Sequence, residues 1–322
     1  MNKKIIAFTM SLKQSQFEVD RLVTEAKKLG VPVLKALYRE MTFDLNNQNP
    51  KVYVQGEEVT AENTLGMWFR VAGTVSGKYT EGRNLAIRLL QPKGVLCANH
   101  DGYLNWARMG KIAQHGVFIE KEIPVVPTRI FYTKDQITNY ELLMTNFFGW
   151  EYPTIAKHEK GYQGKSVKKF DNGEQVIKFV KKIHEKNVGM FLWQKYLPTK
   201  WDLRVIVLGG EAIGAMKRMA VGKEFRSNYS LGGAVDVWNL SEADRMLAEK
   251  VAKVCGLDYC GVDIMKDEQG NSYILEVNRQ CQFKGFEEST GINVAKAVVE
   301  MFLNKNSLPA GRQAKSKLQT LK

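Results

Sequence analysis

Apolar residues in the first hundred positions follow first a strand-like and then a helix-like spacing. Lys4–Thr9 is a short apolar run of the kind that forms a buried strand. Over residues 14–29 apolar side chains recur every three to four positions, which predicts a helix that stops at Gly30. The next elements are predicted as strand, loop or small hairpin, strand and helix at residues 31–38, 40–62, 65–71 and 81–90. This order predicts a small α/β unit that ends near Asn99.

Past residue 100 the pattern predicts two further units in which helices and strands mix. The first would comprise a helix at 104–119, strands at 123–132 and 152–158, the loop GYQGKSV and a helix at 174–186. The second would comprise helices at 242–255 and 292–303 with strands at 190–196, 203–208, 212–218, 260–265 and 272–278. We therefore expect an α/β and α+β protein whose units span 1–100, 101–188 and 189–303, followed by a tail at 304–322.

The composition is that of a globular protein, with 44% hydrophobic and 25% charged residues in a chain of 322. No apolar run approaches the roughly 20 residues that span a bilayer. The opening MNKKIIAFTM has only a short apolar stretch and is typical of a first strand rather than of a secretory signal. The four cysteines form no CxxC pair and are expected to be buried free thiols. These features predict a cytoplasmic protein with no membrane partner.

The net charge of +13 indicates an anionic partner. Five of the excess positive charges lie in the segment 304–322, which has no acidic residue and is expected to be disordered. We expect it to be a solvated tail. Contact with RNA or an acidic protein is the alternative, although the folded part shows no aromatic and basic nucleic-acid motif. Nucleotide phosphates and small carboxylates are the other anions that a basic chain attracts.

Two carboxylates and an amide are predicted to meet within GVDIMKDEQGNSYILEVN. Glu276 and Asn278 stand two residues apart in one strand, so both side chains point to the same face. A hairpin centred near Gln269–Gly270 would bring Asp263 opposite Glu276 on that face, with no lysine of the two strands close enough to neutralise the carboxylates. Because burying unpaired carboxylates is costly, this all-oxygen set predicts a site for a hard cation. A solvated strand face with ordinary surface acids is the alternative.

A complementary positive set lies upstream. Lys157 ends an apolar strand, and the glycines at 161 and 164 in the following loop would let backbone N–H groups approach an anion. The GxxxxGK[ST] spacing of a Walker loop is absent, and a plain hairpin turn is the alternative. Arg204 and Arg218 stand at the ends of two apolar strands, where arginines often bind anions; structural ion pairs with Asp202 or Glu224 are the alternative there.

Taken together and in order, KHEKGYQGKSV, QKYLPTKWDLR, GKEFRSNYSLGG, GVDI, LEVN and FEESTGIN resemble the ATP-grasp superfamily, and within it the RimK-like carboxylate–amine ligases. The resemblance extends to about residue 303. It implies an ATP-grasp fold preceded by a Rossmann-like pre-ATP-grasp domain. It also implies ATP as a substrate and Mg²⁺ as the metal, with Mn²⁺ as an alternative, and it makes self-association plausible.

The resemblance implies a role for each matching residue. Contacts with ATP are implied for Lys157, Gly161, Gln163, Gly164 and Asp202, for the adenine-binding segment Gln194, Lys195, Tyr196 and Leu197, and for a lysine before the Pro124 strand, for which Lys111 is the candidate and Arg108 the competitor. Arg204 and Arg218 would stabilise the transferred phosphoryl group and an acyl phosphate, and Asn228 would lie beside the carboxylate substrate. Asp263, Glu276 and Asn278 would bind the metal.

The function implied is ATP-dependent amide bond formation through an acyl phosphate, with glutamate or a similar amino acid added to a protein C-terminus or a small molecule. The sequence departs from the family at Arg279–Gln282, where LEVNRQCQFKG replaces the usual LEVNASPG, which puts the identity of the substrate in doubt. Lys195, where a carboxylate is common, is a smaller departure. The alternatives are an ATP-binding protein altered in catalysis and an RNA-associated protein that binds through its basic tail.

Overall fold

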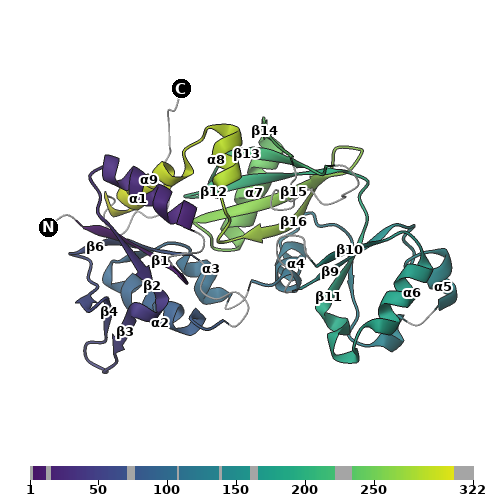
Figure 1. Cartoon of the computed structure of the whole chain (residues 1–322), viewed down its shortest axis with the longest axis horizontal. Helices are drawn as coiled ribbons and strands as arrows, with labels where there is room; N and C mark the ends of the chain where they lie inside the picture. The colour runs from purple at the N-terminus through teal and green to yellow at the C-terminus, as the bar shows by residue number, and fades with distance from the viewer. Residues whose placement is uncertain are drawn as a thin grey trace.

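The computed structural model describes residues 3–11, 16–70, 77–106, 109–137, 140–159, 166–221 and 234–307. Three main sheets follow one another along the long axis of the molecule (Figure 1). A parallel sheet built from the first hundred residues lies at one end, a five-stranded antiparallel sheet lies in the middle, and a four-stranded antiparallel sheet lies at the other end. This arrangement confirms the predicted mixture of α/β and α+β structure.

The first sheet is parallel throughout, with the order β2 (Val33–Leu37), β1 (Lys4–Thr9), β6 (Thr64–Phe69) and β7 (Leu96–Cys97). Every residue of β6 is buried, as expected for a parallel strand covered on both faces. Helices α1 (Gln16–Lys28) and α9 (Val294–Ser307) pack on one face with Ile5 and Ala7. Helices α2 (Thr80–Leu90) and α3 (His100–Asn105) pack on the other face with Ile6 and Phe8.

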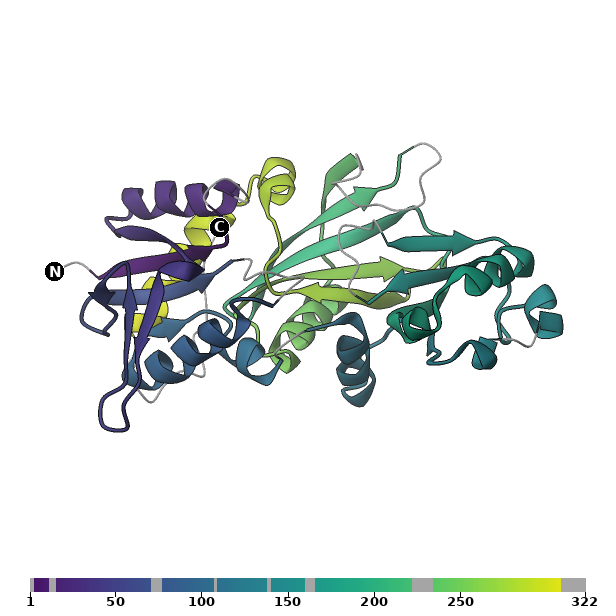
Figure 2. The ribbon, with the colours of Figure 1, turned by 60° about the horizontal axis from the view of Figure 1, so that its bottom comes forward.

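The last helix therefore returns to the first sheet, as the neighbouring purple and yellow ribbons show (Figure 2). A side chain at Gly66 of β6 would collide with the ring of Phe302, so glycine at this position lets α9 approach the sheet closely. Helix α9 continues to Ser307, past the predicted end at residue 303. The rest of the predicted basic tail lies outside the described residues.

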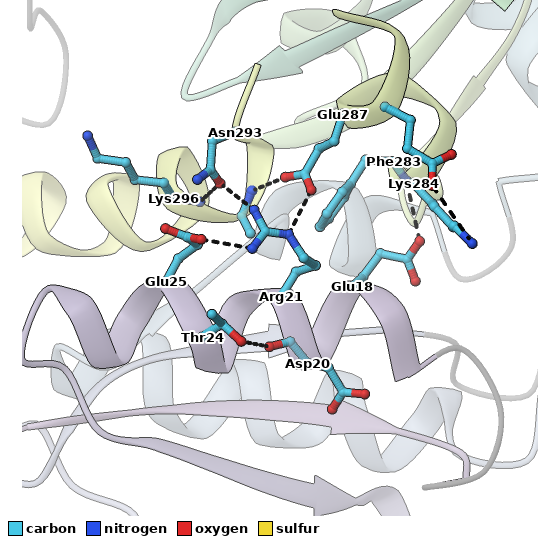
Figure 3. A network of polar contacts seen from close by, with 12 residues as sticks. Glu18, Asp20, Arg21, Thr24, Glu25, Phe283, Lys284, Glu287, Asn293 and Lys296 are labelled. Carbon is cyan, nitrogen blue, oxygen red and sulfur yellow. Dashed lines mark hydrogen bonds and ion pairs between the residues drawn. The ribbon is translucent and has the colours of Figure 1, made fainter. Parts of the chain in front are cut away.

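Polar contacts also join the two ends of the chain (Figure 3). The guanidinium of Arg21 on α1 donates to Glu287 of α8 (Lys284–Thr290) at 2.9 Å, to Glu25 at 2.8 Å and to Asn293 at 3.2 Å. The carboxylate of Glu18 on α1 accepts from the backbone N–H of Phe283. The first sheet and the segment that follows the five-stranded sheet are thus held together by both apolar packing and ion pairs.

A small antiparallel sheet of β3 (Met41–Asp44), β4 (Lys51–Val54) and β5 (Glu57–Glu58) extends from the first unit and confirms the predicted hairpin. The single helix predicted at 104–119 is wrong. Helix α3 ends at Asn105, and α4 (Lys111–Glu120) begins after Gly110, whose backbone is extended with φ −71° and ψ 159°. The apolar spacing continues through this interruption and therefore does not reveal it. Lys111 lies in the first turn of the new helix α4.

The four-stranded sheet has the order β10 (Val167–Phe170), β9 (Thr154–His158), β11 (Phe191–Lys195) and β8 (Thr128–Ile130), with α5 (Tyr140–Thr145) and α6 (Gly173–Lys182) beside it. The strand predicted at 123–132 shrinks to β8, because Pro124 and Pro127 cannot donate to a ladder. The carbonyl of Pro124 instead accepts from the N–H of Ile274, which ties this lobe to the middle sheet. Short 3-10 helices occur at Tyr38–Glu40, Gln91–Lys93, Lys134–Ile137 and Glu185–Met190.

The middle sheet has the order β14 (Ala234–Trp238), β13 (Glu211–Met219), β12 (Trp201–Leu208), β15 (Tyr259–Lys266) and β16 (Ser272–Asn278). One face, with Leu203, Val205 and Val207, packs against α7 (Glu242–Val254). On the opposite face Ile206 and Leu208 join the apolar core shared with α8 and α9. The same face carries Asp202 and Arg204 further along β12, where that core ends.

Candidate functional site

The hairpin of β15 and β16 places the predicted metal ligands as the sequence indicates. Asp263 pairs with Glu276, and Gly261 pairs with Asn278. Side chains of paired residues in antiparallel strands share a face, so the two carboxylates and the amide lie on one side of the sheet. The neighbouring pairs Arg204–Asp263 and Asp202–Arg218 extend this polar row across β12 and β13.

Asp263 is enclosed by two guanidinium groups. Arg204 contacts both carboxylate oxygens, with Nη2 to Oδ2 at 2.9 Å, and Arg218 Nη2 lies 3.0 Å from Oδ2. Arg218 Nε also donates to Asp202 at 2.5 Å, and all four side chains are buried. Burial alone would raise the pKa of Asp263, but the two arginines outweigh it and hold that pKa below its usual value.

These contacts bear on two expectations. The sequence predicted that no lysine of the two hairpin strands would neutralise the carboxylates, and Asp263 is paired instead with arginines from β12 and β13. The alternative of an ion pair between Arg218 and Asp202 is present in the structure. Glu224, the other acid considered as a partner, lies outside the described residues. Both arginines are nevertheless held at one oxygen-rich face, where their charge is fixed in place.

The edge strand β16 is held in position by helix α4. The side-chain amide of Gln114 bonds the backbone of Val277 on both sides, accepting from its N–H at 2.8 Å and donating to its carbonyl at 3.2 Å. One turn earlier, Lys111 Nζ lies 3.3 Å from Glu276 Oε2. Gln114 thus acts as a strand partner between Glu276 and Asn278, a role that no motif in the sequence indicated.

Glu276 is ionised at neutral pH. Burial would raise its pKa, but Lys111 and a hydrogen bond from Asn278 Nδ2, 2.9 Å from Glu276 Oε1, bring the net value below its usual range. The bond uses the amino group of Asn278 and not its side-chain oxygen. Lys111 was the candidate for the lysine that contacts ATP, and its competitor Arg108 lies outside the described residues.

Lys157 on β9 reaches the same region from the four-stranded sheet. Burial lowers the pKa of Lys157 to about 8, and the positive charge of Lys111 acts in the same direction. The carboxylates of Glu276, Asp202 and Asp263 oppose this shift. A partly buried lysine between two sheets, with a second lysine nearby, is suited to an anion with more than one negative charge.

The predicted adenine-binding segment lies on and just after β11. The buried side chain of Gln194 donates to Thr128 Oγ1 at 2.8 Å and lies 3.0 Å from His115 Nε2. The backbone of Gln194 pairs with both β8 and β9, and that of Lys195 pairs with β9. Backbone contacts to a base would therefore have to come from Tyr196 and Leu197, and this role stays a prediction. Gly161, Gln163, Gly164 and Asn228 lie outside the described residues.

The charges of the site suit a metal-bound polyphosphate. Four cationic side chains (Lys111, Lys157, Arg204, Arg218) and three carboxylates (Asp202, Asp263, Glu276) give a formal net charge of +1. An Mg²⁺ ion would raise it to +3, which would largely neutralise a nucleoside triphosphate. Among the described residues no group of three His, Cys, Asp or Glu side chains is placed to hold a metal, and the role of Asp263, Glu276 and Asn278 as metal ligands stays a prediction.

A further residue of the site is Gly261, the first letter of GVDI. A Cβ atom there would lie 2.8 Å from Cδ of Arg204 and 2.9 Å from Cβ of Cys281, so glycine leaves the room that the side chain of Arg204 needs to reach Asp263.

All four cysteines are buried free thiols, as predicted. Among the described residues no helix is long and apolar enough to cross a membrane.

Comparison with known proteins places this geometry in a family. Residues 109–302, more than half of the chain, match the RimK-like ATP-grasp domain. The matched segment includes both sheets that line the site. The chain belongs to the RimK-like ATP-grasp family. It is accordingly an ATP-grasp carbon–nitrogen ligase of the ADP-forming type, and the family predicted from the motifs is confirmed.

Relatives of this ligase share nearly their whole length with it. "Probable alpha-L-glutamate ligase 2" of Pseudoalteromonas atlantica is 28% identical over 312 residues, which are 96% of this chain and 98% of the relative. "Probable alpha-L-glutamate ligase" of Psychromonas ingrahamii is 29% identical over 304 residues, 92% of this chain and 94% of the relative. The similarity therefore includes the first, parallel sheet.

Solved structures share the fold. The ATP-grasp ligase PsnB, complexed with minimal precursor, Mg and ADP, has a TM-score of 0.73 at 15% identity and covers 95% of this chain and 99% of its own. The macrocyclase MdnC of Microcystis aeruginosa, bound with precursor peptide MdnA, has a TM-score of 0.63 at 12% identity and covers 94% and 100%. These structures confirm the ATP-grasp fold of this ligase.

Proposed function

We propose that this ligase activates a carboxylate with ATP as an acyl phosphate and joins it to the amino group of glutamate or a similar amino acid. The observation that supports this most is the polar row on the middle sheet, where Arg204 and Arg218 are held around Asp263 beside Glu276 and Asn278. Positive charges fixed next to an oxygen-rich metal set are what phosphoryl transfer to a carboxylate requires.

ATP would bind between the two antiparallel sheets. Lys157 and Lys111 would contact its phosphates, and the segment from Gln194 to Leu197 would hold its adenine. Asp263, Glu276 and Asn278 would hold Mg²⁺, or alternatively Mn²⁺. When bound, the metal reduces the negative charge that repels an attacking carboxylate. Arg204 and Arg218, which contact Asp263, would stabilise the phosphoryl group as it is transferred, and the metal would balance part of the negative charge of Asp263.

The reaction then needs no covalent enzyme intermediate. A carboxylate oxygen of the acid substrate attacks the terminal phosphorus of ATP, the bond to the bridging oxygen breaks, and ADP leaves. Arg204 and Arg218 hold the resulting acyl phosphate, with Asn228 proposed beside it. An amine then attacks the carbonyl carbon, phosphate leaves, and the amine loses a proton as the amide forms. Each guanidinium would stabilise the transition state by roughly 3–4 kcal/mol.

The choice of glutamate as the amine is supported by two relatives that carry the name alpha-L-glutamate ligase. The acid is proposed to be a protein C-terminus or a small carboxylate. The first alternative is supported by the structures of PsnB, which contains a minimal precursor, and MdnC, which contains the precursor peptide MdnA. We also propose the division into units at 1–100, 101–188 and 189–303, and action in the cytoplasm.

A screen for ATP-dependent amino-acid addition tests this function. The full chain, incubated with ATP, Mg²⁺ and each of the common amino acids in the presence of candidate peptides and small acids, should release phosphate and form a product heavier by one residue, read by mass spectrometry. Glutamate should give the highest rate. If no combination releases phosphate while ATP still binds, the chain is a nucleotide-binding protein without ligase activity and the proposal is wrong.

Binding of ATP should weaken as the pH rises above 8. Below its pKa of about 8 the ammonium of Lys157 is charged and attracts phosphate, and above it the lysine must first take up a proton. Above pH 8 the terminal phosphate of ATP is fully ionised, so it does not contribute to the change. The dissociation constant of ATP, measured by calorimetry from pH 7 to 9.5, should rise by up to about tenfold for each pH unit above 8.

The variant Lys157→Arg provides the control, since arginine keeps its charge over the whole range. Its dissociation constant should be nearly independent of pH. An equal pH dependence in the variant and the wild type would show that another group titrates.

A further inference from the structure

One buried asparagine of the first unit bonds the hairpin of β15 and β16. Asn99 stands between β7 and α3 and is 3% exposed. It is the N-cap residue of α3, but its backbone is left-handed, with φ 61° and ψ 26°, and its side chain makes no capping hydrogen bond. Asparagine is favoured at N-caps because its side chain normally accepts from the first turn of the helix. The side chain of Asn99 therefore serves a different partner.

That partner is the open end of the hairpin. Oδ1 of Asn99 accepts from the N–H of Tyr259 at 2.8 Å, and Nδ2 donates to the carbonyls of Tyr259 at 2.8 Å and of Arg279 at 3.0 Å. The reverse orientation of the amide would set its N–H groups against an N–H and its oxygen against two carbonyls, so the orientation is determined. Asn99 thus joins the start of β15 to the residue that follows β16.

These bonds begin where the pairing of the two strands ends. The last pair of β15 and β16 at this end is Gly261–Asn278, and both Tyr259 and Arg279 lie beyond it. Backbone N–H and carbonyl groups that are buried without a partner are costly. The amide of Asn99 supplies the partners that the ladder does not provide at this point.

Close packing places α3 directly against the segment that leads into β15. The N–H of Gly102 on α3 donates to the carbonyl of Gly256 at 2.8 Å, and Gly256 lies in the turn between α7 and β15. A Cβ atom at Gly102 would lie 2.9 Å from this carbonyl oxygen and 2.5 Å from Cδ2 of Leu257. Glycine at position 102 therefore allows the approach that brings Asn99 within reach of the hairpin.

The residues that follow β16 are also bonded by α3 and the first unit. Nη1 of Arg279 donates to the carbonyls of Gly102 and Trp106 at 3.1 and 2.8 Å. Nη2 of Arg70, directly after β6, donates to the carbonyl of Cys281 at 3.0 Å. This is the segment in which the sequence departs from the LEVNASPG of the family. Its backbone is thus held largely by residues that precede the two antiparallel sheets in the chain.

Two side-chain amides consequently hold the peptide groups on either side of Asn278. Gln114 of α4 bonds the N–H and the carbonyl of Val277, and Asn99 bonds the carbonyl of Arg279. The backbone from which the side chain of Asn278 projects is therefore fixed by two different elements, one on each side.

We propose that Asn99 is a positioning residue for the proposed metal site. It holds the carbonyl of Arg279 and so fixes the backbone that carries Asn278, and it holds Tyr259 at the start of the strand that carries Asp263. Altering groups that orient metal ligands without touching the metal typically changes metal affinity by roughly 10- to 100-fold. The inference rests on the proposed function, because it takes the oxygen set on β15 and β16 as the metal ligands. It extends the site to the first unit, in which the sequence predicted no site residue.

Binding of ADP to the full chain, with saturating Mg²⁺ and with EDTA, tests the proposal without turnover. Calorimetry gives the two dissociation constants, and their ratio reports how much the metal strengthens binding. The wild type should bind ADP more tightly with Mg²⁺. In Asn99→Gly this strengthening should be smaller by at least about tenfold, while the affinity in EDTA should change little. Glycine suits the left-handed backbone, so the substitution removes only the side-chain hydrogen bonds.

Asn63→Gly is the matched control. Asn63 belongs to the same unit and its side chain also holds backbone groups, since Oδ1 accepts from the N–H of Thr60 at 3.0 Å and Nδ2 donates to the carbonyl of Glu58 at 2.8 Å. Neither partner belongs to the hairpin, so this variant should lose stability but keep the wild-type ratio. Thermal unfolding identifies variants that fail to fold. If Asn99→Gly is among them, Asn99→Asp replaces it, because it sets an oxygen against the two carbonyls and should lower the ratio as well.

Each outcome supports or overturns the inference separately from the ligase reaction. A folded Asn99→Gly variant with the wild-type ratio, or an equal loss in Asn63→Gly, overturns the inference and leaves the ligase function standing. A ratio that falls in the Asn99 variant alone supports the inference, even in a chain that releases no phosphate, a result that would contradict the ligase function. A wild-type ratio in Glu276→Gln would mean that the metal is held elsewhere, which overturns the metal set and the inference with it.

Discussion

Arg218→Ala is expected to reduce phosphate release from ATP by about 10²- to 10³-fold, the loss typical of removing one preorganised donor to a developing charge. Arg218 contacts both Asp202 and Asp263, so its guanidinium is already oriented before substrates bind. ATP binding should change little, because Lys111 and Lys157 approach the site from other elements. The measurement is the turnover number with saturating substrates beside the dissociation constant of ATP.

Two comparisons separate a catalytic from a structural effect. Removing Arg218 leaves Asp202 without its guanidinium partner, so some loss of stability is expected and thermal unfolding must show that the variant remains folded. Arg245→Ala on α7, which removes a bond to the carbonyl of Ala212, should keep wild-type turnover. A folded Arg218→Ala variant that remains fully active would contradict the role assigned to this arginine.

The part of the site that the sequence predicts best is the part formed by a short hairpin. Asp263 and Glu276 are joined by a tight turn, so strand alternation and turn position together determine that they face one another. The ion pairs of Asp263 could not be obtained in this way. They require β12 to lie beside β15, and spacing along the chain does not reveal the order of strands that are far apart in sequence.

Contacts between distant segments explain the other differences. The return of α9 to the first sheet depends on the fit of Phe302 against Gly66, which the spacing of apolar residues in either element does not indicate. The same holds for Gln114, whose side chain completes the edge of β16. The helix predicted at 104–119 failed for a local reason, because its apolar period continues across the extended backbone at Gly110.

Glu276→Gln should raise the Mg²⁺ concentration needed for half-maximal activity by at least about tenfold, because the substitution removes one of two carboxylate charges from the proposed metal set but keeps the size of the side chain. It should also lower the maximal rate, since the ion pair between Lys111 and the carboxylate of Glu276 is lost. Glu268→Gln, in the exposed turn of the same hairpin, is the matched control and should leave the Mg²⁺ dependence unchanged. Titration of activity with Mg²⁺ at fixed ATP gives both values. Identical curves for Glu276→Gln and the wild type would mean that the metal is held elsewhere, and the oxygen set on β15 and β16 would lose its proposed function.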